Sequence, residues 1–230
     1  VPLGGTTLFL RRAALMQVGG WDAHNVTEDA ELGLRLARHG YRTEIIETTT
    51  FEEANAAIRP WIRQRSRWQK GYLLTWAMAM RRPRQLWRDL GPMRFWAMQV
   101  QILFAVAGFL TAPLLWSLMI KPFGFSHPLD GFVGPLGYGM LATIFVASLM
   151  LSISLTFHAT KAPHLRSLRP YVVLCELYFL LGTVSAWRAL MEMLARPFFW
   201  AKTQHGHFGG ASTAGDAAEP ARPVPFAPLP

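Results

Sequence analysis

Two long runs without a charged residue constrain this chain more than any other feature. Residues 95–120 and 132–157 each contain 26 amino acids and no Asp, Glu, Lys or Arg. A helix needs about 20 apolar residues to cross the hydrocarbon core of a bilayer, so each run is long enough to span it. Only 16% of the whole chain is charged and 51% is hydrophobic. The composition therefore argues against an ordinary soluble globule, and we predict two membrane spans.

The remaining charges are sorted along the chain. Residues 20–53 hold eight of the fourteen acids, whereas residues 59–94 hold ten bases and one acid. Bases collect on the cytoplasmic side of membrane helices, which predicts a cytoplasmic position for 81–94 and 161–169 and an outside position for the loop 121–131. The net charge of +9 thus indicates the membrane surface as a partner and not nucleic acid, which would require the bases in the soluble part.

A third apolar stretch, residues 171–195, contains Glu176, Arg188 and Glu192 and has bases on both flanks. A span would leave one basic flank outside, whereas a helix in the cytoplasmic interface would leave neither there. We favour an interfacial or re-entrant helix, with a third span as the alternative. The single cysteine, Cys175, suits a reducing compartment or a membrane and excludes a disulfide scaffold.

The first part of the chain has the pattern of an α/β lobe. Residues 1–12 predict a strand and turn, and a short helix over 12–17 should end at the following glycine pair. Thr27 is a plausible N-cap for a second helix that Gly40 closes. Residues 41–47 alternate and predict a strand. We therefore expect an α/β fold followed by an α-helical membrane region.

A long helix should follow from Pro60 to about residue 80. Its aromatic residues recur at spacings of seven, four and four, among bases, as in a helix at the membrane interface. The predicted organisation is a lobe over 1–58, interfacial helices over 59–94, a membrane region over 95–208 and a disordered tail rich in Ala, Pro and Gly over 209–230.

Thr27-Glu28-Asp29 is the first candidate for chemistry. An acid-rich helix start is most simply a cap, because the helix dipole favours negative charge there. The functional alternative places the Asp29 carboxylate at the edge of a cleft, where it accepts a proton from an attacking hydroxyl group.

The segment Gln64-Arg65-Ser66-Arg67-Trp68 is the second candidate. Gln64, Arg67 and Trp68 share one helical face with Gly71, at i, i+3, i+4 and i+7. An amide, a guanidinium group and an indole beside a glycine that clears space suit a sugar and a phosphate. The simpler alternative is a membrane-surface helix that these side chains only anchor.

The third candidate is a loop that follows the third apolar stretch, residues 171–195. This loop carries Trp200, Lys202, Thr203, His205 and Gly206. Its lysine, threonine and histidine before a glycine could contact a diphosphate, although a basic juxtamembrane loop is the simpler interpretation. A metal site at His205 and His207 is weaker still, because no further ligand cluster accompanies them.

Together these motifs resemble the C-terminal half of membrane-integrated family 2 glycosyltransferases, the group of cellulose, hyaluronan and chitin synthases. The resemblance covers about residues 1–206. It rests on Gly4-Gly5-Thr6, Gly19-Gly20-Trp21-Asp22, Thr27-Glu28-Asp29 and Gly40-Tyr41-Arg42, followed by Gln64-x-x-Arg67-Trp68 and the apolar runs. A final Trp-x-Lys-Thr-x-His-Gly segment is similar to the end of bacterial polysaccharide synthases.

The resemblance implies a GT-A catalytic lobe on the cytoplasmic side of the inner membrane and inverting transfer from a nucleotide sugar to a glycan. Asp29 would be the general base. Glu28, Gln64, Arg67 and Trp68 would line the acceptor site and contact the donor diphosphate. Trp200, Lys202, Thr203 and His205 would belong to a gating loop over the nucleotide, with His205 where other members carry lysine.

The resemblance also implies a Mg²⁺ or Mn²⁺ ion held by an Asp-x-Asp motif, and this chain has no such motif. We therefore expect a fragment that keeps the base and the acceptor motif, lacks the donor and metal half, and is inactive alone. A non-catalytic multi-pass membrane protein, acting as a subunit or scaffold, is the alternative function.

Overall fold

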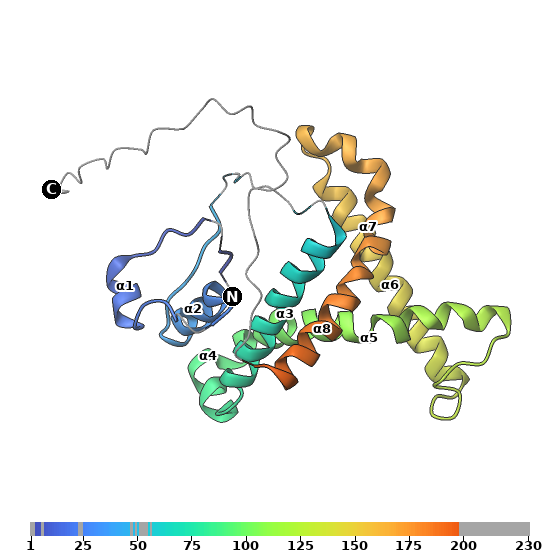
Figure 1. Ribbon diagram of the computed structural model, residues 1–230, viewed down its shortest axis with the longest axis horizontal. Helices are drawn as coiled ribbons and strands as arrows, with labels where there is room; N and C mark the ends of the chain where they lie inside the picture. Colours follow the sequence, from blue (N-terminus) through green and yellow to red (C-terminus); the bar gives the residue numbers. More distant parts are fainter. Residues whose placement is uncertain are drawn as a thin grey trace.

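The computed structural model describes residues 3–5, 7–22, 25–46, 48, 50, 55 and 57–197. These residues form helices joined by turns and extended segments (Figure 1). The helices are α1 (Arg12–Gln17), α2 (Glu28–Arg38), α3 (Ile58–Ala79), α4 (Pro83–Met98), the π-helix η1 (Gln99–Phe104), α5 (Ala105–Ser117), the 3₁₀-helix η2 (Leu118–Phe123), α6 (Pro135–Ala159), the 3₁₀-helix η3 (Pro163–Tyr171), α7 (Val172–Phe179) and α8 (Leu181–Ala195).

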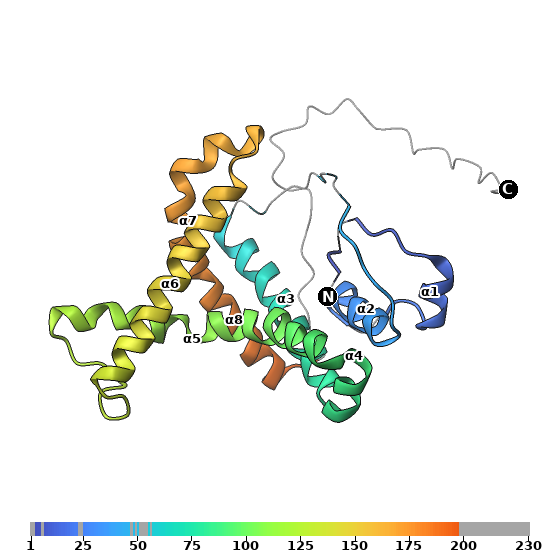
Figure 2. The ribbon, with the colours of Figure 1, turned by 180° about the vertical axis from the view of Figure 1, so that it is seen from behind.

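Helices α3 and α8 lie side by side at the centre of the molecule (Figures 1 and 2). Helices α1 and α2 lie on one side of this pair, and α6 and α7 lie on the other. Helix α8 turns its small residues Gly182, Ser185, Ala186 and Ala189 inward, and all four are buried. Small side chains let two helix backbones approach closely, which explains the intimate contact with α3.

The predicted α/β fold is wrong for the part of the chain that the structure describes. Among the described residues, the segments 7–10 and 41–46 belong to no helix, and no strand ladder pairs them. Ile45 and Ile46 in the second of these segments are 98% and 59% exposed. Alternating residues favour an extended backbone, but a strand is stable only when its N–H and C=O groups pair with a neighbouring strand. Local pattern alone could not supply that partner.

The predicted short helices and their ends are confirmed. After α2, the backbone N–H of Gly40 donates to Ala37 O and that of Tyr41 donates to Leu36 O, with Gly40 at φ +81°. This hydrogen-bond pattern is a Schellman motif, which requires a left-handed residue and therefore favours glycine. The same pattern ends α1, where Gly19 has φ +88°. The long helix predicted from Pro60 is α3.

Two continuous helical segments are long and apolar enough to cross a membrane, at 83–123 and 135–159. The first is bent where Gly91, at φ +73°, precedes Pro92. The second, α6, is about 37 Å long at 1.5 Å per residue, more than the hydrocarbon thickness of about 30 Å. None of its residues is buried. A helix that is apolar all round and unburied in its own chain suits a lipid environment.

The third apolar stretch is a bent pair of helices. The segments 163–177 and 181–195 meet at an angle of 47° and together have the length and composition of a span. A bend of this kind belongs either to a broken span or to a re-entrant segment. Both alternatives from the sequence therefore stand, and the bend explains why the stretch had no simple pattern.

An apolar core joins α2 to α3 and α4. Its buried members come from α2, α4 and η1, and Tyr72 and Trp76 of α3 pack against them; the buried residues are Leu34, Ala37, Leu86, Leu90, Met98 and Ile102. A charged contact adds to this core, because Arg38 Nε and Nη2 of α2 both donate to Asp89 Oδ2 of α4, at 2.9 and 2.8 Å. These contacts fix the orientation of α2 on α3.

Neutralising Asp89 should loosen the docking of α2. The Arg38–Asp89 pair is only partly exposed and has two donors on one oxygen. We expect Asp89→Asn to lower the free energy of unfolding by about 1 kcal/mol. A double-mutant cycle with Arg38→Gln, measured by denaturation in detergent micelles, checks this. Additive effects of the two substitutions would show that the contact contributes nothing.

A polar cluster closes the loop between the two long apolar segments. The ring Nδ1 of the buried His127 accepts from the Leu129 N–H at 3.1 Å and lies 3.2 Å from the Tyr138 hydroxyl group. Its Nε2 therefore carries the proton and donates to Ser117 Oγ at 2.8 Å. Asp130 binds the His127 backbone N–H and not the ring. The cluster of Ser117, His127, Asp130 and Tyr138 thus fixes the conformation of the loop and is not a catalytic Ser-His-Asp triad.

Acid should weaken the hydrogen bonds that Asp130 makes within this loop. The hydrogen bond from Lys121 at 2.7 Å, and then that from the His127 N–H, hold the pKa of Asp130 well below its ordinary value of 3.8. A lowered carboxyl pKa gives stability that is present above the ordinary value and is lost as the pH falls below it. We expect the hydrogen-exchange protection of the His127 amide to be constant at neutral pH and to fall below about pH 4. Asp130→Asn should remove this pH dependence, and an unchanged profile would contradict the assignment.

Candidate active site

The turn before α2 is built by two polar side chains. Asn25 Oδ1 accepts from the Thr27 N–H at 3.0 Å, and Asp29 Oδ1 accepts from the Ala30 N–H at 2.8 Å. Thr27 is the N-cap residue, as predicted, but its side chain makes no capping hydrogen bond. Asn25 and Asp29 therefore pair backbone N–H groups that the helix leaves open, and the first turn also carries the exposed Glu28.

The turn rests directly on α3. Thr27 is 5% exposed, and a Cβ atom on Gly71 would lie only 2.5 Å from Thr27 Cγ2 and 2.6 Å from Thr27 Oγ1. One turn further along α3, Asn25 Nδ2 donates to Thr75 Oγ1 at 3.0 Å. Because Gly71 follows Arg67 and Trp68 by one helical turn, the start of α2 meets the end of the predicted motif face. Gly71 thus admits Thr27, whereas the sequence suggested that it clears space for a sugar.

The Asp29 carboxylate lies near Gly5 and near Tyr72 of α3. Its Oδ2 would be 3.0 Å from a Cβ atom on Gly5, so a side chain at Gly5 would crowd it. On the other side lies Tyr72 of α3: burial, and secondly the negative charge of Asp29, raise the pKa of this phenol. Tyr72 therefore stays a neutral hydrogen-bond donor near the carboxylate at physiological pH.

The motif face of α3 carries a cation between two indoles. The Arg65 guanidinium carbon lies 4.6 Å from the ring centroid of Trp68 and 5.5 Å from that of Trp61. Arg65 Nε is buried and has no hydrogen-bond partner among the described residues. This arrangement fixes the Trp68 indole by cation–π contact. Gln64, Arg67 and Trp68 are all half-buried, so part of each side chain remains accessible.

The opposite face of α3 is anchored on α8. Ser185 Oγ donates to Gln69 Oε1 at 2.8 Å, and Lys70 Nζ donates to the Arg196 carbonyl at 2.7 Å. Burial lowers the pKa of Lys70, and the nearby Glu192 partly offsets this effect. Two buried polar contacts of this kind set the rotation of α3 about its axis, which turns the motif face toward α2.

The structure brings the start of α2, which carries Glu28 and Asp29, against Gly71 and Thr75 of α3, one and two helical turns beyond Arg67 and Trp68. Within the described residues, no hydrogen bond or ion pair links Asp29 to Gln64, Arg67 or Trp68. The predicted loop residues Trp200, Lys202, Thr203 and His205 lie outside the described part of the chain.

Three residues contribute through contacts that were not predicted from the sequence. The contact of Arg65 with two indoles could have been predicted, because Trp61 and Trp68 stand four before and three after it on one helical face. Asn25 and Tyr72 carried no comparable signal, since their roles depend on how α2 docks. For the metal ion that the resemblance implies, the described residues offer no group of three or more His, Cys, Asp or Glu side chains.

Comparison with known proteins assigns the family. Residues 1–181 match the family described as glycosyl transferase family group 2, which is more than half of the chain and includes the α2 and α3 site. The chain therefore belongs to this family. This confirms the family predicted from the ordered motifs.

Several curated proteins are similar to parts of the chain. A probable glycosyltransferase, YdaM, of Bacillus subtilis is 35% identical over 29% of this chain and 16% of its own length. The beta-monoglucosyldiacylglycerol synthase of a Synechocystis species is 34% identical over 54% of this chain and 28% of its own length. The UDP-forming cellulose synthase catalytic subunit of Xanthomonas axonopodis pv. citri is 37% identical over 29% of this chain and 9% of its own length. The chain thus spans less than a third of each relative, and no solved structure matches it.

Proposed function

We propose that this chain forms the acceptor side of an inverting hexosyltransferase that moves a sugar from a nucleotide-sugar donor to a glycan at the cytoplasmic face of the inner membrane. Family membership supplies the reaction class. The observation that carries the proposal is the seating of Thr27 against Gly71, because it sets the turn that holds Asp29 beside the helix of Gln64, Arg67 and Trp68.

The chemistry assigned to these residues is a single displacement. Asp29 accepts the proton of the acceptor hydroxyl group while that oxygen forms a bond to the anomeric carbon of the donor. The bond from this carbon to the nucleoside diphosphate breaks, and the diphosphate leaves with the electron pair. Because attack and departure occur on opposite faces, the configuration at the anomeric carbon is inverted.

The α3 side chains bind and orient the two substrates in this proposal. Trp68 offers an indole face to the acceptor sugar, and the contact with Arg65 keeps that face in one orientation. The Gln64 amide can both donate to and accept from sugar hydroxyl groups. Arg67 has a fork of N–H donors that suits the oxygens of the leaving diphosphate.

The proposed acceptor and location rest on separate grounds. One relative is named for cellulose, which supports a growing polysaccharide as acceptor. Another is named for a monoglucosyldiacylglycerol, so a lipid hydroxyl group is the second acceptor class to test. The helices at 83–123 and 135–159 support a multi-pass membrane location, and the basic flanks support a cytoplasmic site.

A transfer assay tests this proposal. Membranes that contain the full-length protein are supplied with each of a panel of labelled nucleotide hexoses, and the products are separated into polymer and lipid fractions. We expect one donor to label the polymer fraction, with the anomeric configuration, read by NMR, opposite to that of the donor. Retained configuration would reject the inverting mechanism, label in the lipid fraction would assign the second acceptor class, and no transfer from any donor would reject the hexosyltransferase.

A further inference from the structure

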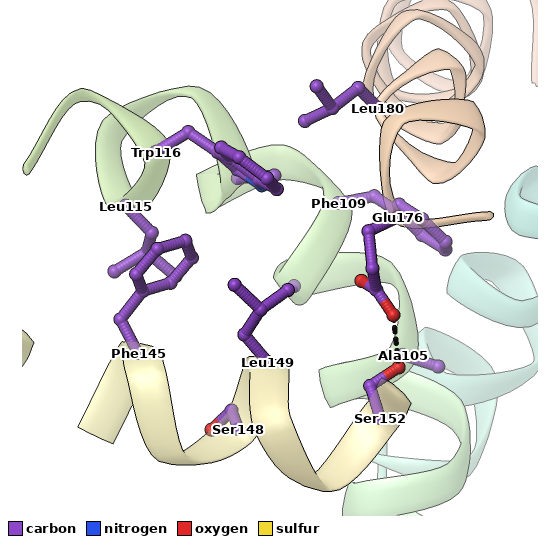
Figure 3. A pocket seen from close by; sticks show the side chains of 12 residues that line it. Ala105, Phe109, Leu115, Trp116, Phe145, Ser148, Leu149, Ser152, Glu176 and Leu180 are labelled. Atoms are coloured by element: carbon purple, nitrogen blue, oxygen red, sulfur yellow. Dashed lines mark hydrogen bonds between the residues drawn. The ribbon is translucent and has the colours of Figure 1, made fainter. Parts of the chain in front are cut away.

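A cavity of about 300 Å³ lies among α5, α6 and α7 and shares no residue with the candidate active site (Figure 3). Most of its wall is apolar: the large side chains are Phe109, Leu115, Trp116, Phe145, Leu149 and Leu180. Its size is at the lower end of the range for small-molecule sites, about 300–1,000 Å³. The cavity is therefore large enough for a headgroup-sized ligand.

One end of the cavity is polar. Glu176 of α7 points toward α6, where Ser152 Oγ donates to Glu176 Oε1 at 2.6 Å (Figure 3). Ser148, one turn earlier on α6, lines the same side. Among the described residues, Ser152 is the hydrogen-bond partner of Glu176, and the other carboxylate oxygen has none. A carboxylate that faces an apolar helix interface is rare and usually marks a functional site.

The polar end lies at a definite depth along α6. Ser152 precedes the end of α6 by seven residues, which is about 10 Å at 1.5 Å per residue. Since a centred α6 exceeds the hydrocarbon core by about 3–4 Å at each end, Ser152 lies about 7 Å inside the core when α6 spans the bilayer. The polar groups are therefore near the glycerol and upper acyl region of the lipids and below the level of charged headgroups.

The lining selects among ligands. Among the described residues that line the cavity, none is Lys, Arg or His, so a phosphate group would have no cation to pair with. A glycan would leave many hydroxyl groups without partners, because only four of the described lining side chains can form hydrogen bonds: Trp116, Ser148, Ser152 and Glu176. A neutral lipid with one free hydroxyl group avoids both costs, since Glu176 accepts its hydrogen bond and the apolar wall contacts its chains.

We propose that this cavity binds the glycerol end of a diacylglycerol-type neutral lipid, with Glu176 and Ser152 as the hydrogen-bonding end of the site. The site is also connected to α3 through α8. Phe109 lines the cavity and packs against Gly182 of α8, whose carbonyl group is 3.5 Å from Gln69 Nε2 of α3. An occupied cavity thus supports the contact between α5 and α8 on which the position of α3 depends.

Photolabelling tests the site without any transfer reaction. The full-length protein is placed in phosphatidylcholine nanodiscs that contain a small fraction of a photoreactive diacylglycerol, and labelled peptides are mapped by mass spectrometry. We expect labels on the lining segments of α5 and α6, removed by excess dioleoylglycerol but not by additional phosphatidylcholine. Labels confined to α2 and α3, or equal competition by the phospholipid, would overturn the proposal.

Gly108 provides a space-filling variant. It lines the cavity, and a Cβ atom there would meet no atom within 4 Å, so Gly108→Leu should fill the cavity without strain in the backbone. Leucine also has a higher helix propensity than glycine. We expect labelling to fall about tenfold in Gly108→Leu, because the leucine side chain would occupy part of the volume that the ligand needs. Unchanged labelling in a variant with the wild-type melting temperature would overturn the site.

Two serines on α6 give a matched pair for the polar end. Ser152→Ala removes the group that holds Glu176, whereas Ser154→Ala changes an exposed serine that does not line the cavity. Glu176→Leu removes the acceptor itself and should reduce labelling about fivefold or more. We expect a smaller loss for Ser152→Ala and none for Ser154→Ala. Equal labelling of all three variants and wild type would overturn the role of Glu176. Asp29→Asn, which changes a residue outside the cavity, should leave labelling unchanged.

Discussion

Asp29→Asn should reduce sugar transfer by the full-length protein by about 10²–10⁴-fold, the usual contribution of a general base. Asparagine has the shape of aspartate and keeps an oxygen that can accept from the Ala30 N–H, so the turn before α2 should survive. What is lost is the ability to accept a proton from the acceptor hydroxyl group. We therefore expect kcat to fall while the KM for the nucleotide sugar changes little, because Asp29 acts on the acceptor.

Glu31→Gln is the matched control for this variant. It neutralises another acid in the first turn of α2, whose partner is Arg35 four residues later on the same helix. This pair is partly buried, and helical pairs at this spacing contribute about 0.3–0.5 kcal/mol, so transfer should remain within about twofold of wild type. The rate is measured with labelled donor at matched protein levels in membranes. Equal losses in both variants would indicate that α2 needs its acidic turn for stability, and full activity in Asp29→Asn would remove Asp29 from the mechanism.

Elements that depend on local chemistry were predictable from the sequence. The ends of α1 and α2 follow from Gly19 and Gly40, because each glycine takes a left-handed conformation that other residues resist. The two long apolar segments follow from length and the absence of charge, although helix formation continues beyond the uncharged run to Pro83 at one end. In each case the signal lies within a single continuous segment of the chain.

The prediction of strands was wrong because strand formation depends on residues that are far away in the sequence. The segment 41–46 has the alternation of a strand, yet nothing among the described residues pairs with it, and its isoleucines are exposed. The rotation of α3 about its own axis could not be predicted, for a similar reason. The burial of Gln69 and Lys70 depends on α8, more than 100 residues later, whose placement the sequence left open between an interface and a span.

The interpretation of Gly71 shows the same limit within the candidate site. Its spacing from Gln64, Arg67 and Trp68 correctly predicted a shared helical face and a need for a small residue. The sequence could not show what occupies the space, because that depends on where the start of α2 docks. Since Thr27 fills it, Gly71 positions the base and does not contact a sugar in this arrangement.

Gly71→Ala should therefore uncouple the two halves of the site. The new methyl group would lie 2.5 Å from Thr27 Cγ2 and 3.0 Å from Thr27 Cβ, so the turn that holds Asp29 must move. Overpacking of this kind costs about 1–3 kcal/mol of stability. A displacement of about 1 Å at a reacting group lowers transfer by about 10²-fold. Transfer and thermal unfolding of the same membrane preparations measure the two effects.

A compensating substitution separates displacement of the turn from general damage to α3. Thr27→Gly removes all three atoms that the new methyl group would meet, and it loses little capping because the Thr27 side chain makes no capping hydrogen bond. We expect Gly71→Ala combined with Thr27→Gly to recover most of the transfer activity lost in Gly71→Ala alone. Gly139→Ala in α6, where a Cβ atom meets nothing within 4 Å, is the control for an alanine at a helical glycine. If the double variant stays as inactive as Gly71→Ala while Gly139→Ala is active, the contact between Thr27 and Gly71 does not position the base, because relief of the clash would then have no effect on the reaction.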